Sequence, residues 1–222
     1  MTTLFSYCIP YDDGAAPNPF WGVCTLAICK PRIRQAANVG DWIVGTGSKN
    51  SPIGDVSNKV VYAMLVTQKM TMEDYDLFTK SKLPHKIPRI ESKDLRRQHG
   101  DSIYDFSKYP PCLRPSVHNE ENRATDLSGG WMLLSDHFFY FGDKTISLPE
   151  DLLGIVKQGQ GHRSTSNMPN VDPFIQWIHG LGYQPGSLIG KPQMWLNAQV
   201  PFGACATGRR QEAEADLAEF DT

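Results

Sequence analysis

VGDWIVGTGS, residues 39–48, contains the feature on which the fold depends: an apolar strand that runs directly into glycines and hydroxyl side chains. Trp42 to Val44 have the character of a buried strand, and Gly45 and Gly47 remove two side chains from its end. Glycines in a strand indicate a bend, or a close approach of another backbone or a ligand. The stretch is therefore either a corner of a small barrel or sheet, or a place where a ligand contacts the main chain.

The residues around this stretch predict three further strands and a short helix. The helix begins at Pro31, which the first turn of a helix tolerates, and ends near residues 38–40. The strongest strand signal is residues 59–69, where both faces are apolar, so we expect a central strand covered on two sides. The other two strands are expected at residues 3–9 and 24–30.

The second half of the chain mixes short elements with long polar stretches. Thr71, with Asp74 three residues later, predicts a capped helix to about Lys80. The polar, proline-containing residues 81–130 predict long loops laid over the core, which usually carry function or are locally disordered. The remaining expected elements are a short strand at 101–106, strands at 131–135 and 138–142 around a turn at Asp136 and His137, and helices at 149–157 and 171–182.

These elements predict an α+β fold: a small, strongly bent mixed β-sheet or a barrel, with short flanking helices and long loops. A doubly wound parallel sheet would need a regular helix after each strand, which the sequence does not provide. We expect one domain over residues 1–203, followed by an acidic C-terminal tail, 204–222.

Composition narrows the class of protein. The chain has 222 residues, a formal net charge of −2 and 21% charged residues, so no overall basic excess indicates a nucleic-acid binder. Its five cysteines are irregularly spaced without a CxxC pair, and neither a signal peptide nor a long apolar span is present. We therefore expect a cytoplasmic protein with free thiols and no membrane association.

Three clusters hold candidate functional residues. The first is APNPFWGVCT, where Asn18 lies between two prolines and can present its carboxamide to a base edge or bond its own backbone. Trp21 can stack on a flat ligand or fill the core. Cys24 is a candidate nucleophile if a neighbouring cation or base stabilises its thiolate, and otherwise a core cysteine.

The second and third clusters are rich in glycine. Gly45, Gly47 and Ser48 fit neither the P-loop nor the dinucleotide-binding spacing, and a strand corner alone explains the glycines. In GQGHRS, residues 159–164, the glycines are followed by His162 and Arg163. Imidazole suits proton transfer near neutral pH, and the arginine fork suits a phosphate or the edge of guanine. The GQGHRS cluster is therefore a candidate for catalysis or binding.

Several known sites are missing from the sequence. The six histidines show no HExxH motif and no short spacing to a cysteine, so no metal site is expected. The zinc deaminase pattern and the GxSxG hydrolase motif are also absent. The sequence indicates no cofactor.

The segments that contain these clusters resemble the nucleotide-modification-associated domain family, second type, over about residues 3–195. The resemblance is carried by APNPFWGVCTLAICKPRIRQAANVGDWIVGTGS, VVYAMLVTQKMTMEDY, GDSIY, FFYFG and GQGHR. It implies a bacterial or phage protein that is associated with nucleotide or DNA modification systems. It does not imply a particular reaction. The layout around VGDWIV and VTQKMT is also similar to PUA-like barrels, including the EVE and ASCH groups, in which a bent barrel forms a pocket for a base.

The segments that carry this resemblance select candidate positions in all three clusters. The resemblance does not assign a catalytic role to any of them. Those positions are Asn18, Trp21, Cys24, Thr25, Lys30, Asp41, Gly45, Ser48, Tyr62, Asp101, Tyr104, His162 and Arg163.

The resulting hypothesis is a domain that recognises a nucleobase, expected to be a modified one, as a nucleotide or within a nucleic acid. Trp21, Trp42 or Tyr62 would stack on the base, which is worth about 1–3 kcal/mol per base. Asn18 and the main chain at residues 45–48 would read its edge, and Arg163 would hold a phosphate. Thr25 is a further expected ligand-binding residue.

Two alternatives stay open at this point. One is an enzyme that modifies the base or nucleotide, with His162 as general acid/base and Cys24 as nucleophile. The other is a structural partner in a modification or defence complex, which would bind other proteins through the loops at residues 81–130.

Overall fold

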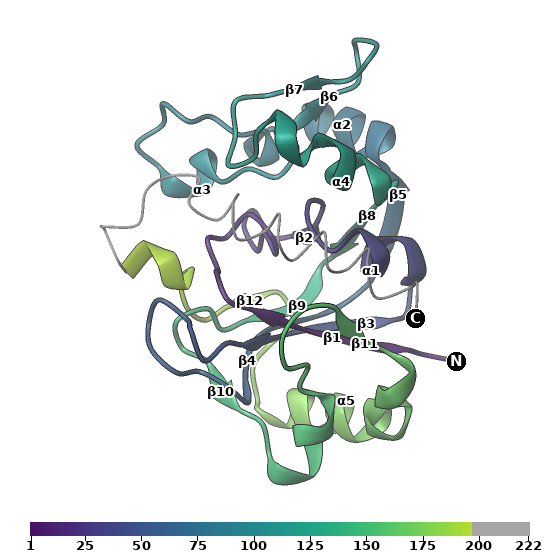
Figure 1. Ribbon diagram of the computed structural model, residues 1–222, viewed down its shortest axis with the longest axis vertical. Coiled ribbons are helices and arrows are strands. Elements are labelled where there is room, and N and C mark those ends of the chain that lie inside the picture. Colours follow the sequence, from purple (N-terminus) through teal and green to yellow (C-terminus); the bar gives the residue numbers. More distant parts are fainter. Residues whose placement is uncertain (197–222) are drawn as a thin grey trace.

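The computed structural model describes residues 1–196, which form an α+β fold around a central mixed sheet (Figure 1). Within that range the sheet has seven strands in the order β11-β1-β3-β4-β9-β12, with β10 paired to β4. The pairs β1–β3 and β9–β12 are parallel, and the others are antiparallel. The strands are β1 Leu4–Ile9, β3 Trp42–Gly47, β4 Lys59–Leu65, β9 His137–Tyr140, β10 Ile146–Ser147, β11 His162–Arg163 and β12 Ser187–Leu188.

The sheet bends sharply where two of its strands continue into a second, three-stranded sheet. That sheet has the order β2-β8-β5, formed by Cys24–Leu26, Trp131–Ser135 and Gln68–Thr71. Leu65 of β4 pairs with His137 of β9, and Gln68 of β5 pairs with Leu134 of β8, so one ladder runs through both sheets. The predicted strand at 59–69 is thus two strands. The predicted turn at Asp136 does not form a hairpin, because β8 and β9 do not pair with each other. They follow one another along the same ladder, which bends at Asp136.

The expected bent mixed sheet is confirmed, whereas a closed barrel is not present among the described residues, because the strand order has two free ends. β4 is central, as predicted, with β3 on one side and β9 on the other. Buried side chains cover both of its faces: Val61, Tyr62 and Met64 belong to one core, and Val60 and Ala63 to another.

Helices pack against both the central sheet and the second sheet. α5 (Val171–Gly180) packs Phe174 and Ile178 against one face of the central sheet, in the lower part of Figure 1. α1 (Pro31–Ala36) and α2 (Met72–Ser81) lie by the second sheet. α2 starts as predicted, because the Thr71 Oγ1 accepts a hydrogen bond of 3.1 Å from the Asp74 amide. The helix expected at 149–157 is a 3-10 helix, Glu150–Ile155.

Residues 81–130 contain more regular structure than their polar sequence predicts. Short elements occur throughout the segment, which packs against α2 and the second sheet through Ile103, Tyr104 and Val117. These elements are too short for a periodic apolar pattern to appear in the sequence. They are 3-10 helices at Pro84–Lys86 and Glu120–Asn122, α3 Leu95–Gln98, β6 Tyr104–Asp105, β7 Cys112–Leu113 and α4 Arg123–Ser128.

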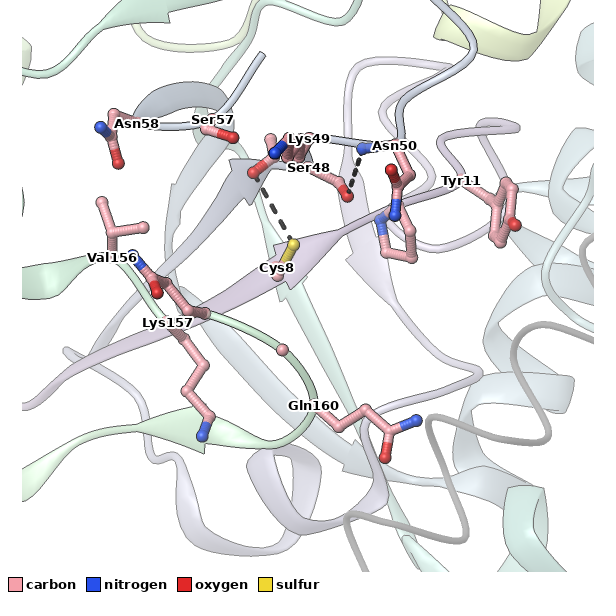
Figure 2. Close-up of a pocket in the computed structure, with 14 residues that line it drawn as sticks. Cys8, Tyr11, Ser48, Lys49, Asn50, Ser57, Asn58, Val156, Lys157 and Gln160 are labelled. Atoms are coloured by element: carbon pink, nitrogen blue, oxygen red, sulfur yellow. Dashed lines mark hydrogen bonds between the residues drawn. The ribbon is translucent and has the colours of Figure 1, made fainter. Parts of the chain in front are cut away.

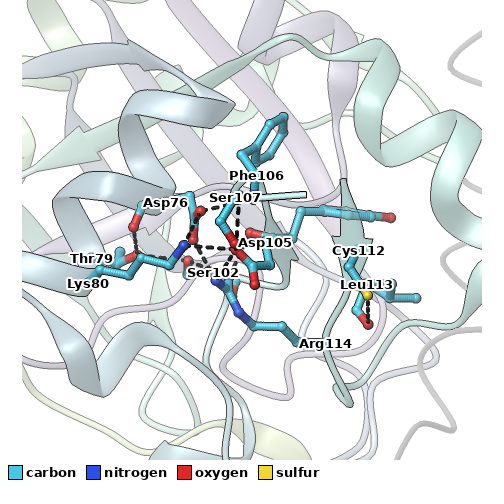
Figure 3. Close-up of polar contacts among 11 residues, drawn as sticks. Asp76, Thr79, Lys80, Ser102, Asp105, Phe106, Ser107, Cys112, Leu113 and Arg114 are labelled. Carbon is cyan, nitrogen blue, oxygen red and sulfur yellow. Dashed lines mark hydrogen bonds and ion pairs between the residues drawn. The ribbon is translucent and has the colours of Figure 1, made fainter. Parts of the chain in front are cut away.

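An ion-pair network ties this segment to α2 (Figure 3). The buried carboxylate of Asp76 accepts hydrogen bonds from Lys80 at 2.8 Å and from Arg114 at 2.6 Å. The Phe106 amide also donates to it, at 2.9 Å. Burial raises the pKa of Asp76, but these hydrogen bonds outweigh it and hold the pKa below its ordinary value.

Asp76→Asn is therefore expected to destabilise the protein at pH 7 by about 2 kcal/mol, less than for a fully buried ion pair because Lys80 is partly exposed. A carboxylate with a lowered folded pKa contributes stability above its unfolded pKa, about 3.9, and loses it as the pH falls further. Urea unfolding should show the gap between wild type and variant narrowing below about pH 4. Glu73→Gln, on the exposed face of the same helix, is the control. A gap that is constant from pH 7 to 3 would contradict this role for the Asp76 charge.

Candidate functional site

A hollow of 570 Å³ opens where β1 and β3 end, between the corner after β3 and the loop that leads into β11 (Figure 2). Its walls come from three parts of the chain that are far apart in sequence. The residues that line it are Cys8, Pro10, Tyr11, Gly47, Ser48, Lys49, Asn50, Ser57, Asn58, Val156, Lys157, Gln158, Gly159 and Gln160. Two of the three predicted clusters, the glycine-serine corner and GQGHRS, thus meet at one site.

The corner after β3 is held in place by its own main chain. The register with β4 shifts between Gly45 and Thr46, which marks a bulge. The Val56 amide then donates to the Ser48 carbonyl at 3.2 Å, and the Asn50 amide donates to the Ser48 Oγ at 3.1 Å. The corner is therefore a fixed turn that presents its outer edge to the hollow.

The charge of the lining has one sign. Lys49 and Lys157 are the charged side chains among the described residues that line the hollow, and no carboxylate joins them there. The amide side chains of Asn50, Asn58 and Gln160 supply both donors and acceptors. This arrangement suits a ligand that carries negative charge and a polar edge.

A second hollow of 510 Å³ adjoins the first and brings in Arg163. The two share Asn58, Val156, Lys157 and Gln158. Arg163 lies opposite Ser6 in the antiparallel pair of β1 and β11, and directly opposed residues point to the same face of a sheet. The Arg163 guanidinium also donates from Nε to the Ser166 Oγ at 3.1 Å, which helps to fix its position.

Asn18 and Thr25, two predicted ligand-binding residues, lie in a buried network away from this hollow. The Asn18 side chain donates to the His99 carbonyl at 2.9 Å and accepts from Lys86 at 2.7 Å. Thr25 donates its hydroxyl to the Asp101 carboxylate. Both side chains are fully buried, so their polar groups serve the fold in this structure.

The aromatic side chains predicted to stack on a base do not line the hollow either. Tyr62 is fully buried and shares a hydrogen bond of 2.9 Å with the Tyr7 hydroxyl. Trp42 is 2% exposed, with its ring against Phe174 and two histidine rings. Trp21 is half-buried elsewhere, with its ring 4.6 Å from the His85 ring centroid.

The two predicted catalytic residues are also placed outside the hollow. Cys24 is fully buried, and burial raises the pKa of its thiol to about 12, so the thiolate that a nucleophile needs is disfavoured. His162 lies opposite Tyr7, on the other face of β1 from Arg163, with its ring 5.9 Å from that of Phe5. Gly45 is buried and faces Ile9 and Tyr62 in the core.

Of the predicted binding residues, Gly47, Ser48 and Arg163 reach the two hollows. The residues that the sequence interpretation missed are polar loop residues with no motif around them: Lys49, Asn50, Ser57, Asn58, Lys157 and Gln158. The one available signal was proximity in sequence, since Lys49, Asn50, Lys157 and Gln158 flank the two glycine-rich clusters.

Neither a cluster of metal ligands nor a membrane-spanning helix is found among the described residues. No group of three or more histidine, cysteine, aspartate or glutamate side chains among residues 1–196 is placed to hold a metal ion. In the same range, no helix combines the length and the apolar character that crossing a membrane requires. The four cysteines in that range are free thiols, as expected.

Comparison with known proteins gives one match. A family model described as nucleotide modification associated domain 2 matches residues 1–199. No curated protein and no solved structure matches the chain. The family resemblance inferred from the sequence is thereby confirmed, whereas the PUA-like resemblance stays a prediction.

Proposed function

The chain belongs to the nucleotide modification associated domain 2 family, and on that premise we propose that it binds a nucleotide in the hollow between the β3 corner and the β11 loop. Lys157 and Arg163 hold the phosphate, and the amide side chains on the opposite wall bind the polar edge of the base. The proposal retains the predicted role of Arg163 and moves base recognition from Asn18 to the loop amides.

The observation that carries the proposal is the combination of size and charge. Ligand sites usually have volumes of about 300–1,000 Å³, and the main hollow, at 570 Å³, lies within that range. Lys157 and the adjoining Arg163 offer cationic donors on the side of the β11 loop, and Lys49 adds a cation on the side of the corner. A nucleotide has an anionic end and a hydrogen-bonding end, which fits Lys157 and Arg163 on one wall and the amide of Asn50 on the other.

Arg163→Ala is expected to weaken nucleotide binding about 10- to 150-fold, because a hydrogen bond to a charged group contributes about 1.5–3 kcal/mol. Lys157→Ala should have a similar effect. The measurement is a thermal-shift panel of mononucleotides and short oligonucleotides with unmodified and modified bases, followed by calorimetry on the ligand that stabilises most. At 100 times the dissociation constant a ligand stabilises the fold by about 2.7 kcal/mol.

Lys108→Ala removes an exposed lysine outside both hollows and is the matched control. Equal affinities for wild type, Arg163→Ala and Lys157→Ala would refute the proposal. A preference for oligonucleotides over mononucleotides would identify the ligand as a base within a strand, which an enzyme or reader reaches by flipping it out.

The alternatives have less support from the geometry. Catalysis by His162 would need a ligand on the opposite face of β1 from Arg163, because the two side chains alternate along β11. A protein partner at residues 81–130 stays a prediction. That segment is anchored to α2 and to the core by buried polar contacts, so a partner would meet a structured surface.

A further inference from the structure

Outside the two hollows, a thiol, an imidazole and a carboxylate from distant parts of the sequence lie in a row. The Cys29 Sγ is 3.8 Å from the His118 Nε2, and the His118 Nδ1 is 2.7 Å from an Asp126 carboxylate oxygen. Tyr104 donates its hydroxyl to the same carboxylate oxygen at 3.0 Å. In this order a base contacts a nucleophile and a third group orients the base, which is the logic of a catalytic triad.

The imidazole beside the thiol carries a positive charge. Burial lowers the pKa of His118, but the hydrogen bonds with Asp126 and Cys29 outweigh it and raise the pKa to about 9. The imidazole is then protonated at pH 7 and directs an N–H toward the sulfur. An adjacent imidazolium stabilises a thiolate.

The backbone holds the two ends of the row in fixed positions. Cys29 and the following Lys30 have φ angles of 62° and 43°, a left-handed conformation that is rare for residues other than glycine. The fully buried Arg34 donates from Nε to the Cys29 carbonyl at 2.9 Å and from Nη2 to the Asp126 carbonyl at 2.7 Å. One guanidinium therefore sets the distance between the nucleophile and the orienting carboxylate.

Cys29 is partly exposed, whereas its partners are buried. Cys29 is half-buried and lines a shallow depression with Tyr7, Ala16 and Lys30. His118 and Asp126 are 6% and 2% exposed. This is the partially exposed, electropositive setting in which reactive cysteines occur.

We propose that Cys29 is a catalytic nucleophile toward an acyl carbon, an amide or an ester, with His118 as its acid–base partner and Asp126 and Arg34 as positioning residues. The thiolate forms a C–S bond to the acyl carbon, and the C–N or C–O bond then breaks as His118 donates its Nε2 proton to the leaving group. Water, deprotonated by the neutral His118, attacks the thioester and releases the acid and the thiolate. The sum is hydrolysis, which needs no oxidant, reductant or cofactor.

The test compares two thiols of the same folded protein. At pH 6 an ordinary thiol with a pKa of about 8.5 is less than about 1% thiolate. Iodoacetamide should therefore alkylate Cys29 at least tenfold faster than the exposed Cys112, as followed by mass spectrometry of the peptides. His118→Gln should reduce the Cys29 rate to that of Cys112, and Cys112→Ser should leave it unchanged.

The acyl step is tested with p-nitrophenyl acetate. Wild type should release a burst of one p-nitrophenolate per chain and carry the acetyl group on Cys29, and Cys29→Ser should lose both. Equal alkylation rates for Cys29 and Cys112 in wild type would overturn the activated thiol, and fast alkylation without acetyl transfer would overturn the substrate class. Nucleotide binding by Cys29→Ser is a separate readout, so this proposal and the proposed function can fail independently.

Discussion

Replacing Lys86 by methionine is expected to lower the free energy of unfolding by about 3–5 kcal/mol, because it removes a buried cation from its hydrogen-bond acceptors and from the nearby charge of Asp101. Lys86 is fully buried, and its Nζ donates to the Asn18 carbonyl, the Asn18 Oδ1 and the Val23 carbonyl at 2.7–2.8 Å and to the Thr25 Oγ1 at 2.9 Å. Burial lowers the pKa of Lys86 to about 8, while the charge of Asp101 opposes that shift. The ammonium is thus still charged at pH 7.

The free energy of unfolding falls because methionine leaves buried polar groups without their hydrogen-bond donor. The buried Asp101 keeps its hydrogen bond from Tyr75 at 2.6 Å but loses the cation near it. The Asn18 and Val23 carbonyls also lose a donor in a place that water does not reach. Unsatisfied buried polar groups cost about 1–3 kcal/mol each, so the cost is set by desolvation.

Chemical unfolding at pH 7 measures the effect directly. Lys82→Met, at an exposed position a few residues earlier, is the matched control and should change stability by less than about 0.5 kcal/mol. The double variant Lys86→Met/Asp101→Asn should lose less than the sum of the two single variants, because the second change neutralises the stranded charge. A loss below about 1 kcal/mol for Lys86→Met would show that the network is not anchored by this lysine.

Gly47→Ala is expected to destabilise the protein by about 3 kcal/mol, the upper end of the range for overpacking. A Cβ at this position would overlap the Val56 carbonyl oxygen and lie 2.6 Å from the Val56 Cγ2. The carbonyl is main chain, so no rotamer change relieves the clash. The Val56 amide is also fixed by its hydrogen bond to Ser48, so the corner itself must shift.

Gly180→Ala is the control for this prediction, because nothing lies within 4 Å of its added Cβ. Thermal unfolding should separate the two variants by about 6–12 °C, at about 2–4 °C per kcal/mol for a chain of this size. Since Gly47 also lines the hollow, Gly47→Ala should weaken nucleotide binding as well. Unchanged stability would mean that the corner has room for a side chain, and the glycine would then be explained by the ligand alone.

The geometry is compatible with both interpretations of the glycine-serine corner: a turn at the end of a strand, and a place where a ligand contacts the main chain. Gly45 faces Ile9 and Tyr62 in the core, and Gly47 faces the Val56 main chain, which explains both glycines by packing. The outer edge of the same turn, at Gly47 and Ser48, borders the hollow. The corner ends β3 and forms part of the candidate site.

The sequence by itself determined the local structure wherever one short pattern was sufficient. Two apolar faces at residues 59–69 predicted the central strand, and Thr71 with Asp74 predicted the start of α2. The quoted segments predicted the family. These signals depend on neighbours within a few residues, so they survive without knowledge of the tertiary fold.

Only the tertiary structure decided which polar side chains face a hollow and which are used in the core. The carboxamide of the buried Asn18 is bound by Lys86, which lies far along the chain. The Cys29 thiol contacts the imidazole of His118, which is 89 residues away in sequence. Arg163 and His162 are neighbours in sequence, yet strand alternation sends them to opposite faces. The direction and the burial of a polar side chain depend on such contacts between distant residues. The local spacing of residues in the sequence does not reveal these contacts.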